Sequence, residues 1–287
     1  MDDPPGRRPL SEPAGPSASI VPPGLDGTVA LLRHGESTWV AEGRFQGQGD
    51  PPLSLAGHRQ AALAAGRLAR PHQPPSLPVP VGPPLEIVHS PLSRTTETAA
   101  AVATALAAAD GFGMDVPRRP DPGFLEIGQG EWEGLPGAEI ERRWPEVIAG
   151  WRRDPLRHWA PGGESIAAVD VRTRAALAGL LARLAERGGS TAGRRSHVLG
   201  YGEPPSRDPW TILVGHDGVF KVALLALMDL PLGRFWSFPF ALCGISVVEF
   251  RAGRPRLRAH NLTDHLAPFD DERAQAVEAE RTEAGAL

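Results

Sequence analysis

Histidine and arginine side chains come directly after apolar segments at separate places in this sequence. Arg33 and His34 follow one such segment and His216 follows another, while Arg94 falls in the first turn of a predicted helix. An imidazole can act as a nucleophile or exchange a proton near neutral pH. A guanidinium beside the free N–H groups of a helix N-terminus favours an anion. These residue types could therefore bind and transform an anionic substrate.

Each of these residues also has a purely structural interpretation. Arg33-His34-Gly35 could be a polar turn after a strand. Arg94 could be a surface arginine, and His216 could be a buried histidine with satisfied hydrogen bonds. Their occurrence together at three strand ends favours a functional site. We also expect Gly35 to let the backbone approach a ligand, because glycine has no Cβ.

Alternating strands and helices are expected to position these residues. Short apolar runs bounded by polar turns predict strands, and apolar residues at helical spacing predict helices. The expected strands are Thr28–Leu32, Leu85–His89, Trp210–Val214 and, as a hairpin around Ala252-Gly253, Ile245–Phe250 and Arg256–Ala259. The expected helices are Leu55–Ala69, Pro91–Ala109, Glu139–Ala149, Ser165–Arg187 and Gly218–Met228.

This alternation predicts an α/β fold, a three-layer α/β/α sandwich with a mainly parallel central sheet. Ligands of such sheets bind outside the carboxyl ends of the strands, where His34 and His216 fall. Ser90 is expected to be the N-cap of the second helix, with Pro91 at its first position. Asp217 is expected to cap the last helix of this series.

The chain divides by composition into three parts. Residues 1–27 are rich in Pro, Gly and Ser and are predicted to be a disordered head. Residues 28–268 are predicted to form one domain, and residues 269–287 an acidic tail. A domain of this size buries about 75% of its unfolded surface, so it needs no metal or disulfide for stability.

Composition also excludes several function classes. A formal net charge of −4 offers no electrostatic footprint for nucleic acid. The single cysteine, Cys243, excludes an intramolecular disulfide and any multi-cysteine metal site. No apolar run approaches the roughly 18 residues of a membrane span, and the first residues lack the apolar region of a signal peptide. We expect a cytoplasmic protein with neither a nucleic acid nor a membrane as partner.

Five blocks of sequence, in a fixed order, carry a resemblance to a known family. The blocks are Arg33-His34-Gly35-Glu36-Ser37 with Gly43-Arg44-Phe45-Gln46-Gly47 and Pro52-Leu53-Ser54-Leu55-Ala56-Gly57; Ser90-Pro91-Leu92-Ser93-Arg94-Thr95-Thr96-Glu97-Thr98-Ala99; Leu125-Glu126-Ile127 with Gly130-Glu131-Trp132-Glu133-Gly134; Pro161-Gly162-Gly163-Glu164-Ser165; and Gly215-His216-Asp217-Gly218-Val219. Over about residues 28–268 the chain resembles the histidine phosphatase superfamily, also called the phosphoglycerate mutase-like family. Its third block is similar to the phosphatase branch.

The resemblance implies a role for each matching residue. His34 would be the nucleophile that becomes a phosphohistidine, surrounded by Arg33, Arg94 and His216. Glu126 would donate a proton to the leaving oxygen. The remaining substrate contacts implied by the resemblance are Gln46 and Gly47.

Phosphoryl transfer requires the same set of groups. Phosphoryl transfer depends mainly on positioning and on stabilising charge at the equatorial oxygens. Two guanidinium groups and an imidazole supply this without a metal or another cofactor, so we expect neither. A carboxyl group is needed because an alkoxide leaves poorly unless it is protonated.

The function that follows is a metal-independent phosphomonoesterase acting on a small phosphorylated metabolite. A cofactor-dependent phosphoglycerate mutase and an inactive phospho-ligand-binding protein remain alternatives. A bifunctional kinase–phosphatase is excluded because no Gly-x-x-x-x-Gly-Lys-Ser/Thr loop is present.

Two positions depart from the family pattern, and two loops separate the blocks. Val40 stands where asparagine is common, and Asp217 where glycine or asparagine is frequent. Pro71–Pro84 holds seven prolines and is expected to be a surface loop, as is Gly188–Pro209. Specificity in such folds lies in loops of this kind, so the sequence does not name the substrate or the oligomeric state.

Overall fold

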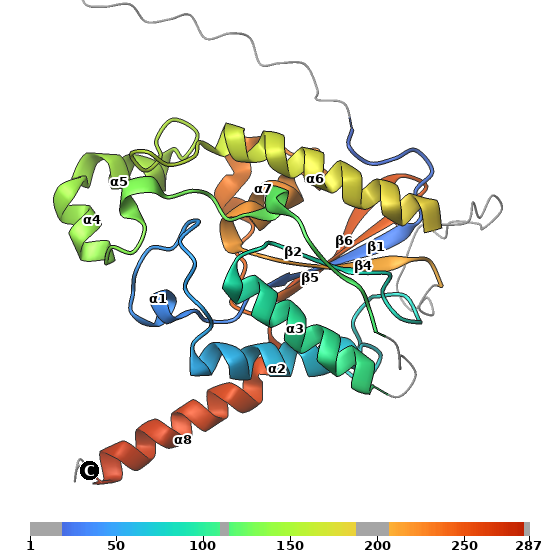
Figure 1. The fold of residues 1–287 in the computed structure, drawn as a ribbon, viewed down its shortest axis with the longest axis horizontal. Coiled ribbons are helices and arrows are strands. Elements are labelled where there is room, and N and C mark those ends of the chain that lie inside the picture. The colour runs from blue at the N-terminus through green and yellow to red at the C-terminus, as the bar shows by residue number, and fades with distance from the viewer. Residues whose placement is uncertain (1–18, 110–114, 188–206, 284–287) are drawn as a thin grey trace, which may run out of the picture.

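The computed structural model describes residues 19–109, 115–187 and 207–283. Six strands form one sheet in the order β3-β2-β4-β1-β5-β6 (Figure 1). The strands are β1 (Gly27–Arg33), β2 (Ile87–His89), β3 (Arg118–Pro120), β4 (Trp210–Gly215), β5 (Ile245–Arg251) and β6 (Arg254–Leu262). Strands β3, β2, β4 and β1 pair in parallel, and the hairpin β5–β6 adds two antiparallel pairs. The predicted mainly parallel sheet is confirmed.

Strand β3 was not among the predicted strands. Its three residues, Arg118–Pro120, are exposed at the edge of the sheet. An edge strand of charged residues and proline has no apolar run, so the pattern that identifies buried strands is missing from it.

Helices cover both faces of the sheet, as expected for three layers (Figure 1). Alternate residues of β1 point to opposite faces. Val29 and Leu31 pack with α6 (Ile166–Arg187) and α7 (Asp217–Leu227), and Ala30 and Leu32 pack with α2 (Leu55–Ala69) and α3 (Ser93–Ala108). The α-helices are α1 (Thr38–Ala41), α2 (Leu55–Ala69), α3 (Ser93–Ala108), α4 (Gly137–Arg143), α5 (Pro145–Arg153), α6 (Ile166–Arg187), α7 (Asp217–Leu227) and α8 (Ala267–Glu283). Short 3₁₀ helices are η1 (Pro122–Phe124), η2 (Gly130–Trp132), η3 (Leu232–Ser237) and η4 (Asp264–Leu266).

The start of α3 differs from the sequence expectation. The N-cap is Leu92, not Ser90, and the helix begins at Ser93. Asp50 supplies the missing cap from a distant loop: its Oδ1 accepts the Ser93 N–H over 2.6 Å, and its Oδ2 accepts the Ser93 hydroxyl over 2.8 Å. A carboxylate at a helix N-terminus also interacts favourably with the helix dipole.

The predicted helix Glu139–Ala149 is two helices, α4 and α5. The chain breaks at Trp144, which is both the C-cap of α4 and the N-cap of α5. Pro145 occupies the first position of α5, where its missing N–H costs nothing, but it could not continue α4.

The start of the domain lies before the predicted limit. Residues 1–18 lie outside the described part of the chain, but residues 19–27 do not fit the prediction of a disordered head. Val21 and Leu25 are buried in the core, and Gly27 starts β1. At the other end, α8 leaves the body of the protein, and Arg59 of α2 pairs with Glu272 (Figure 1).

Of the two predicted loops, only Pro71–Pro84 lies entirely within the described residues. Residues 71–84 contain neither helix nor strand, as predicted. Most of the predicted loop Gly188–Pro209 lies outside the described residues. In the described ranges, no helix has the length and apolar character needed to cross a bilayer.

Candidate active site

The two site histidines are neighbours because of strand register. Arg33 of β1 pairs with Gly215 of β4, so the next residues, His34 and His216, leave the sheet side by side. Their ring centroids are 5.0 Å apart and the rings meet edge to face at 64°. His34 is 1% exposed and His216 is fully buried.

The hydrogen bonds of His34 determine which ring nitrogen is free. Its Nδ1 lies 2.6 Å from the Gly35 carbonyl oxygen, which can only accept. The proton of the neutral ring is therefore assigned to Nδ1, and Nε2 keeps its lone pair. Burial, and then the charges of Arg94 and Arg33, hold the pKa of His34 well below 6.5. The ring is neutral at physiological pH, the form that can attack an electrophile.

His216 has no hydrogen-bond partner for either ring nitrogen among the described residues. Burial, and then the charge of Arg94, hold its pKa well below 6.5. A buried polar group without a partner costs free energy, and such groups mark places where a ligand completes the hydrogen bonding.

Arg94 is almost completely buried beside these rings. Its Nη1 donates to the Gly49 carbonyl and its Nη2 to the Gly47 carbonyl, both over 2.8 Å, while Nε has no partner. Burial lowers the pKa of Arg94 to about 10, and the charge of Glu126 opposes that shift. The guanidinium therefore stays charged at neutral pH and can bind an anion.

Arg33 adds a second guanidinium to the same place. Its Nη1 donates to the Phe240 carbonyl over 2.5 Å, and its buried Nε has no partner in the described chain. With two guanidinium groups and two neutral imidazoles, the site attracts a multiply charged anion such as a phosphate monoester.

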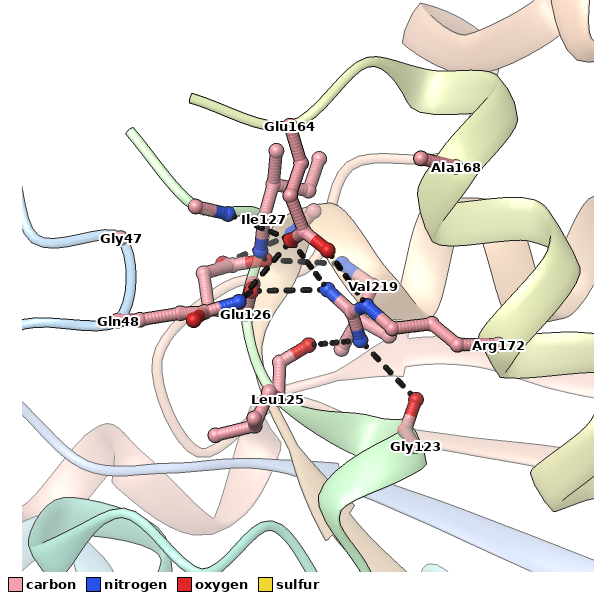
Figure 2. Close-up of polar contacts among 12 residues, drawn as sticks. Gly47, Gln48, Gly123, Leu125, Glu126, Ile127, Glu164, Ala168, Arg172 and Val219 are labelled. Atoms are coloured by element: carbon pink, nitrogen blue, oxygen red, sulfur yellow. Dashed lines mark hydrogen bonds and ion pairs between the residues drawn. The ribbon is translucent and has the colours of Figure 1, made fainter. Parts of the chain in front are cut away.

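Glu126 lies in the loop after η1, at the N-terminus of α7 (Figure 2), and its charge acts on Arg94. Its Oε1 accepts the N–H groups of Ile127 at 2.9 Å and Val219 at 3.0 Å, and its Oε2 accepts that of Gly218 at 3.1 Å. A Cβ at Gly218 would lie 2.6 Å from Glu126 Oε1, so only glycine leaves room for the carboxylate. The helix that begins after His216 therefore also fixes Glu126.

Gln46 and Gly47 lie in the loop that borders Arg94. The Gln46 Oε1 accepts the Ser37 hydroxyl over 2.6 Å. Gly47 has a φ of +56°, a conformation that favours glycine, and its carbonyl holds Arg94. In this structure both residues organise the loop.

Three expectations about individual residues need correction or completion. Gly35 makes a close backbone approach to α2, where a Cβ would overlap the Gly57 carbonyl. The Asp217 carboxylate does not cap α7; it accepts from Lys221 and from the Phe240 N–H. Val40 lies in α1, where its N–H donates to the Ser37 hydroxyl.

Cys243 is completely buried in the core. Burial raises the pKa of its thiol to about 12, which leaves it unreactive at neutral pH. Among the described side chains, no group of three or more His, Cys, Asp and Glu could hold a metal ion.

Other residues of the site were not identified from the sequence. The carbonyl groups of Gly49 and Phe240 hold the two arginines, but a backbone acceptor has no residue type that could reveal it. Glu164 and Arg172 bind the loop that carries Glu126. Glu164 stands in the fourth block, which was a usable signal, whereas Arg172 lies in an ordinary amphipathic helix.

Comparison with protein families gives one match over most of the chain. The model of the histidine phosphatase superfamily, branch 1, matches residues 29–192 and 201–263. The chain belongs to this superfamily. The resemblance inferred from the five sequence blocks is confirmed, and the protein is an enzyme, a phosphatase of the histidine phosphatase type.

Several curated relatives of this histidine phosphatase have phosphatase names. Phosphoserine phosphatase 1 of Hydrogenobacter thermophilus is 29% identical over 86% of this chain and 98% of its own length. Glucosyl-3-phosphoglycerate phosphatase of Mycobacterium tuberculosis is 32% identical over 72% of this chain and 78% of its own length.

Solved structures of superfamily members share the fold. The mycobacterial glucosyl-3-phosphoglycerate phosphatase, solved in complex with VO3, superposes with a TM-score of 0.63 at 28% identity and covers 82% of this chain and 99% of its own. A structure named mycobacterial hydrolase 1 gives a TM-score of 0.65, also at 28% identity, over 82% of this chain and 98% of its own.

Proposed function

We propose that this phosphatase hydrolyses small phosphorylated metabolites through a phosphohistidine on His34, without a metal or other cofactor. The observation that carries the proposal is the state of the buried His34 ring. Its Nδ1 is bound to the Gly35 carbonyl, which leaves Nε2 free beside the guanidinium groups of Arg33 and Arg94.

In the first step, His34 Nε2 attacks phosphorus and the bond to the leaving oxygen breaks. Arg33, Arg94 and His216 stabilise the phosphoryl oxygens, using the donors that have no partner among the described residues. The electron pair of the broken bond goes to the leaving oxygen, which takes a proton from Glu126.

The hydrogen bonds of Glu126 orient its carboxyl group for this step. Oε1 accepts two N–H groups and Oε2 accepts one, so Oε2 keeps an open acceptor position that can hold a proton. All the donors to the two oxygens are backbone N–H groups. The orientation of this position therefore does not depend on a flexible side chain.

In the second step, water attacks the phosphohistidine. Glu126, now ionised, accepts the proton of the water, and the bond from phosphorus to Nε2 breaks to release inorganic phosphate. His34 returns to its neutral form, with the proton still on Nδ1. No electron acceptor or second substrate is needed.

The substrate class is part of the proposal. The relatives are named for phosphoserine and for glucosyl-3-phosphoglycerate, so these two esters head the panel to be tested. We further propose that the enzyme acts in the cytoplasm and has no nucleic-acid partner. Its net charge of −4 supports the second point.

A phosphate-release screen tests this function. The panel contains phosphoserine, glucosyl-3-phosphoglycerate, sugar phosphates, nucleotides, 3-phosphoglycerate and α-ribazole phosphate. We expect release of inorganic phosphate from at least one ester, and no interconversion of 3- and 2-phosphoglycerate. Efficient isomerisation primed by bisphosphoglycerate would instead establish the mutase alternative. Failure to turn over any ester, with tight binding of one, would favour a phospho-ligand-binding protein.

A further inference from the structure

Arg172 of α6 uses three of its five N–H donors on the segment that carries Glu126 and the other two on Glu164 (Figure 2). Nη1 donates to the carbonyl groups of Gly123 at 3.0 Å and Leu125 at 2.8 Å. Nη2 donates to the Glu126 carbonyl at 3.0 Å. The remaining two bonds, from Nε at 3.0 Å and Nη2 at 2.8 Å, go to the Glu164 carboxylate. A guanidinium has five N–H donors, so none is left over.

Glu164 completes this contact from the other side of the loop. Its Oε2 accepts the Gly128 N–H over 2.8 Å, two residues after Glu126. Burial raises the pKa of Glu164, but the hydrogen bonds from Arg172 and Gly128 outweigh it and keep the pKa below its usual value. The carboxylate therefore stays ionised, and the ion pair with Arg172 persists at neutral pH.

Gln48 links the same pair to the loop that holds Arg94. Its Nε2 donates to the Glu126 carbonyl at 3.2 Å and to Glu164 Oε2 at 3.0 Å. Gly47 and Gly49, on either side of Gln48, are the residues whose carbonyls bind the Arg94 guanidinium. The Arg172–Glu164 ion pair thus contacts the loop that carries Glu126 directly and, through Gln48, the loop that holds Arg94.

We propose that Arg172, oriented by Glu164, is a positioning residue for Glu126. It fixes the backbone on both sides of Glu126, while the N-terminus of α7 fixes its carboxylate. This inference rests on the proposed function, in which Glu126 gives its proton to the leaving oxygen. Arg172 does not touch the substrate in this account, because every donor it has is engaged with the protein.

Lysine cannot replace Arg172 in this role. It has three donors around one nitrogen, whereas Arg172 binds three carbonyls and a carboxylate with a planar fork. Since a displacement of about 1 Å can cost 10²-fold in rate, a loosened Glu126 should transfer its proton less efficiently.

Leaving-group dependence separates this role from a merely structural one. An alkyl phosphate needs the proton, whereas nitrophenolate leaves without it. We define the alkyl/aryl ratio as kcat/KM for glycerol phosphate divided by that for p-nitrophenyl phosphate. Arg172→Lys should lower this ratio about tenfold or more, since general acid catalysis contributes 10²–10⁴-fold. Arg172→Ala should do the same, and added guanidinium ion should restore the ratio.

Arg174 provides a matched control on the same helix. It pairs with Asp170 within α6, and its side chain is 19% exposed against 20% for Arg172. Arg174→Lys and Arg174→Ala should leave the ratio unchanged and should not respond to guanidinium ion. If Arg172 variants do not fold, Glu164→Gln, which keeps the side-chain shape, should lower the ratio in the same direction.

Glu126→Gln separates a failure of this inference from a failure of the proposed function. A lower ratio in Glu126→Gln with an unchanged ratio in the Arg172 and Glu164 variants overturns the positioning role alone. An unchanged ratio in Glu126→Gln overturns the proton-donor role and the inference with it. Lower ratios in all three, with the Arg174 variants unaffected, support both.

Discussion

Asp217 and Arg33 bind the backbone N–H and the backbone carbonyl of the same residue, Phe240. The Phe240 N–H donates to Asp217 Oδ1 over 3.2 Å, and the Phe240 carbonyl accepts from Arg33 Nη1 over 2.5 Å. Asp217 is held in turn by Lys221, whose ammonium lies 2.5 Å from Oδ2 and packs over the ring of Trp236. Asp217, one of the departures from the family pattern, therefore helps to position an arginine of the candidate site.

This relationship predicts a binding defect in Asp217→Ala. Without the carboxylate, the Phe240 segment loses an anchor and Arg33 loses a fixed acceptor. We expect vanadate inhibition to weaken about tenfold, the effect of losing one charge-assisted hydrogen bond of about 1.4 kcal/mol. Asp217→Asn, which keeps an acceptor oxygen, should lose less. Equal inhibition of wild type and Asp217→Ala by vanadate would show that Phe240 is held without Asp217.

The low pKa values of His34 and His216 predict the acid limb of the rate profile. Both rings are neutral at physiological pH because burial opposes their protonation. The acid limb of kcat/KM, which reports groups of the free enzyme, should therefore lie below pH 6.5 after correction for ionisation of the substrate. A limb centred at or above pH 6.5 would contradict the burial that the structure gives these rings.

The same shifts predict how stability depends on pH. The unfolded chain binds more protons than the folded one between the lowered pKa values and 6.5, so the free energy of unfolding falls as pH drops through that window. Denaturant unfolding at several pH values measures this. Replacing His216 with phenylalanine removes one of the two titrating groups, so the variant should lose less stability than wild type over the same window.

The two arginines of the candidate site predict activity without a metal. Arg33 and Arg94 supply the positive charge that a cation would supply, and like charges oppose a cation beside them. Activity should survive chelators, and vanadate should inhibit because it can adopt the five-coordinate geometry of the transition state. Loss of activity in EDTA that magnesium or zinc restores would refute this mechanism.

The sequence predicted the side chains of the candidate site better than the groups that hold those side chains in place. His34 and His216 could be predicted because both follow buried strands, and the register of β1 and β4 makes them neighbours. Arg94 could be predicted from its place in the first turn of a helix, whereas Glu126 came from the family blocks. The carbonyl of Phe240 and the cap that Asp50 provides for α3 could not be predicted, since both are contacts between segments far apart in the sequence.

The helices and strands also differ in how far the sequence predicts them. Helices α2 and α6 could be predicted from their apolar periodicity, to within a residue of their observed ends. Strand β3 and the break between α4 and α5 could not, since the first has no apolar residues and the second depends on a single proline, Pro145.

Trapping the phosphorylated enzyme tests whether His34 carries the phosphoryl group. Wild-type enzyme is mixed with radiolabelled phosphomonoester, quenched rapidly and mapped by proteolysis. We predict an acid-labile, base-stable label on His34 that is absent from His34→Ala. The thiol of Cys243 should carry none, because burial keeps its pKa at about 12. Label on a serine or on Cys243, or full turnover by His34→Ala, would contradict the account.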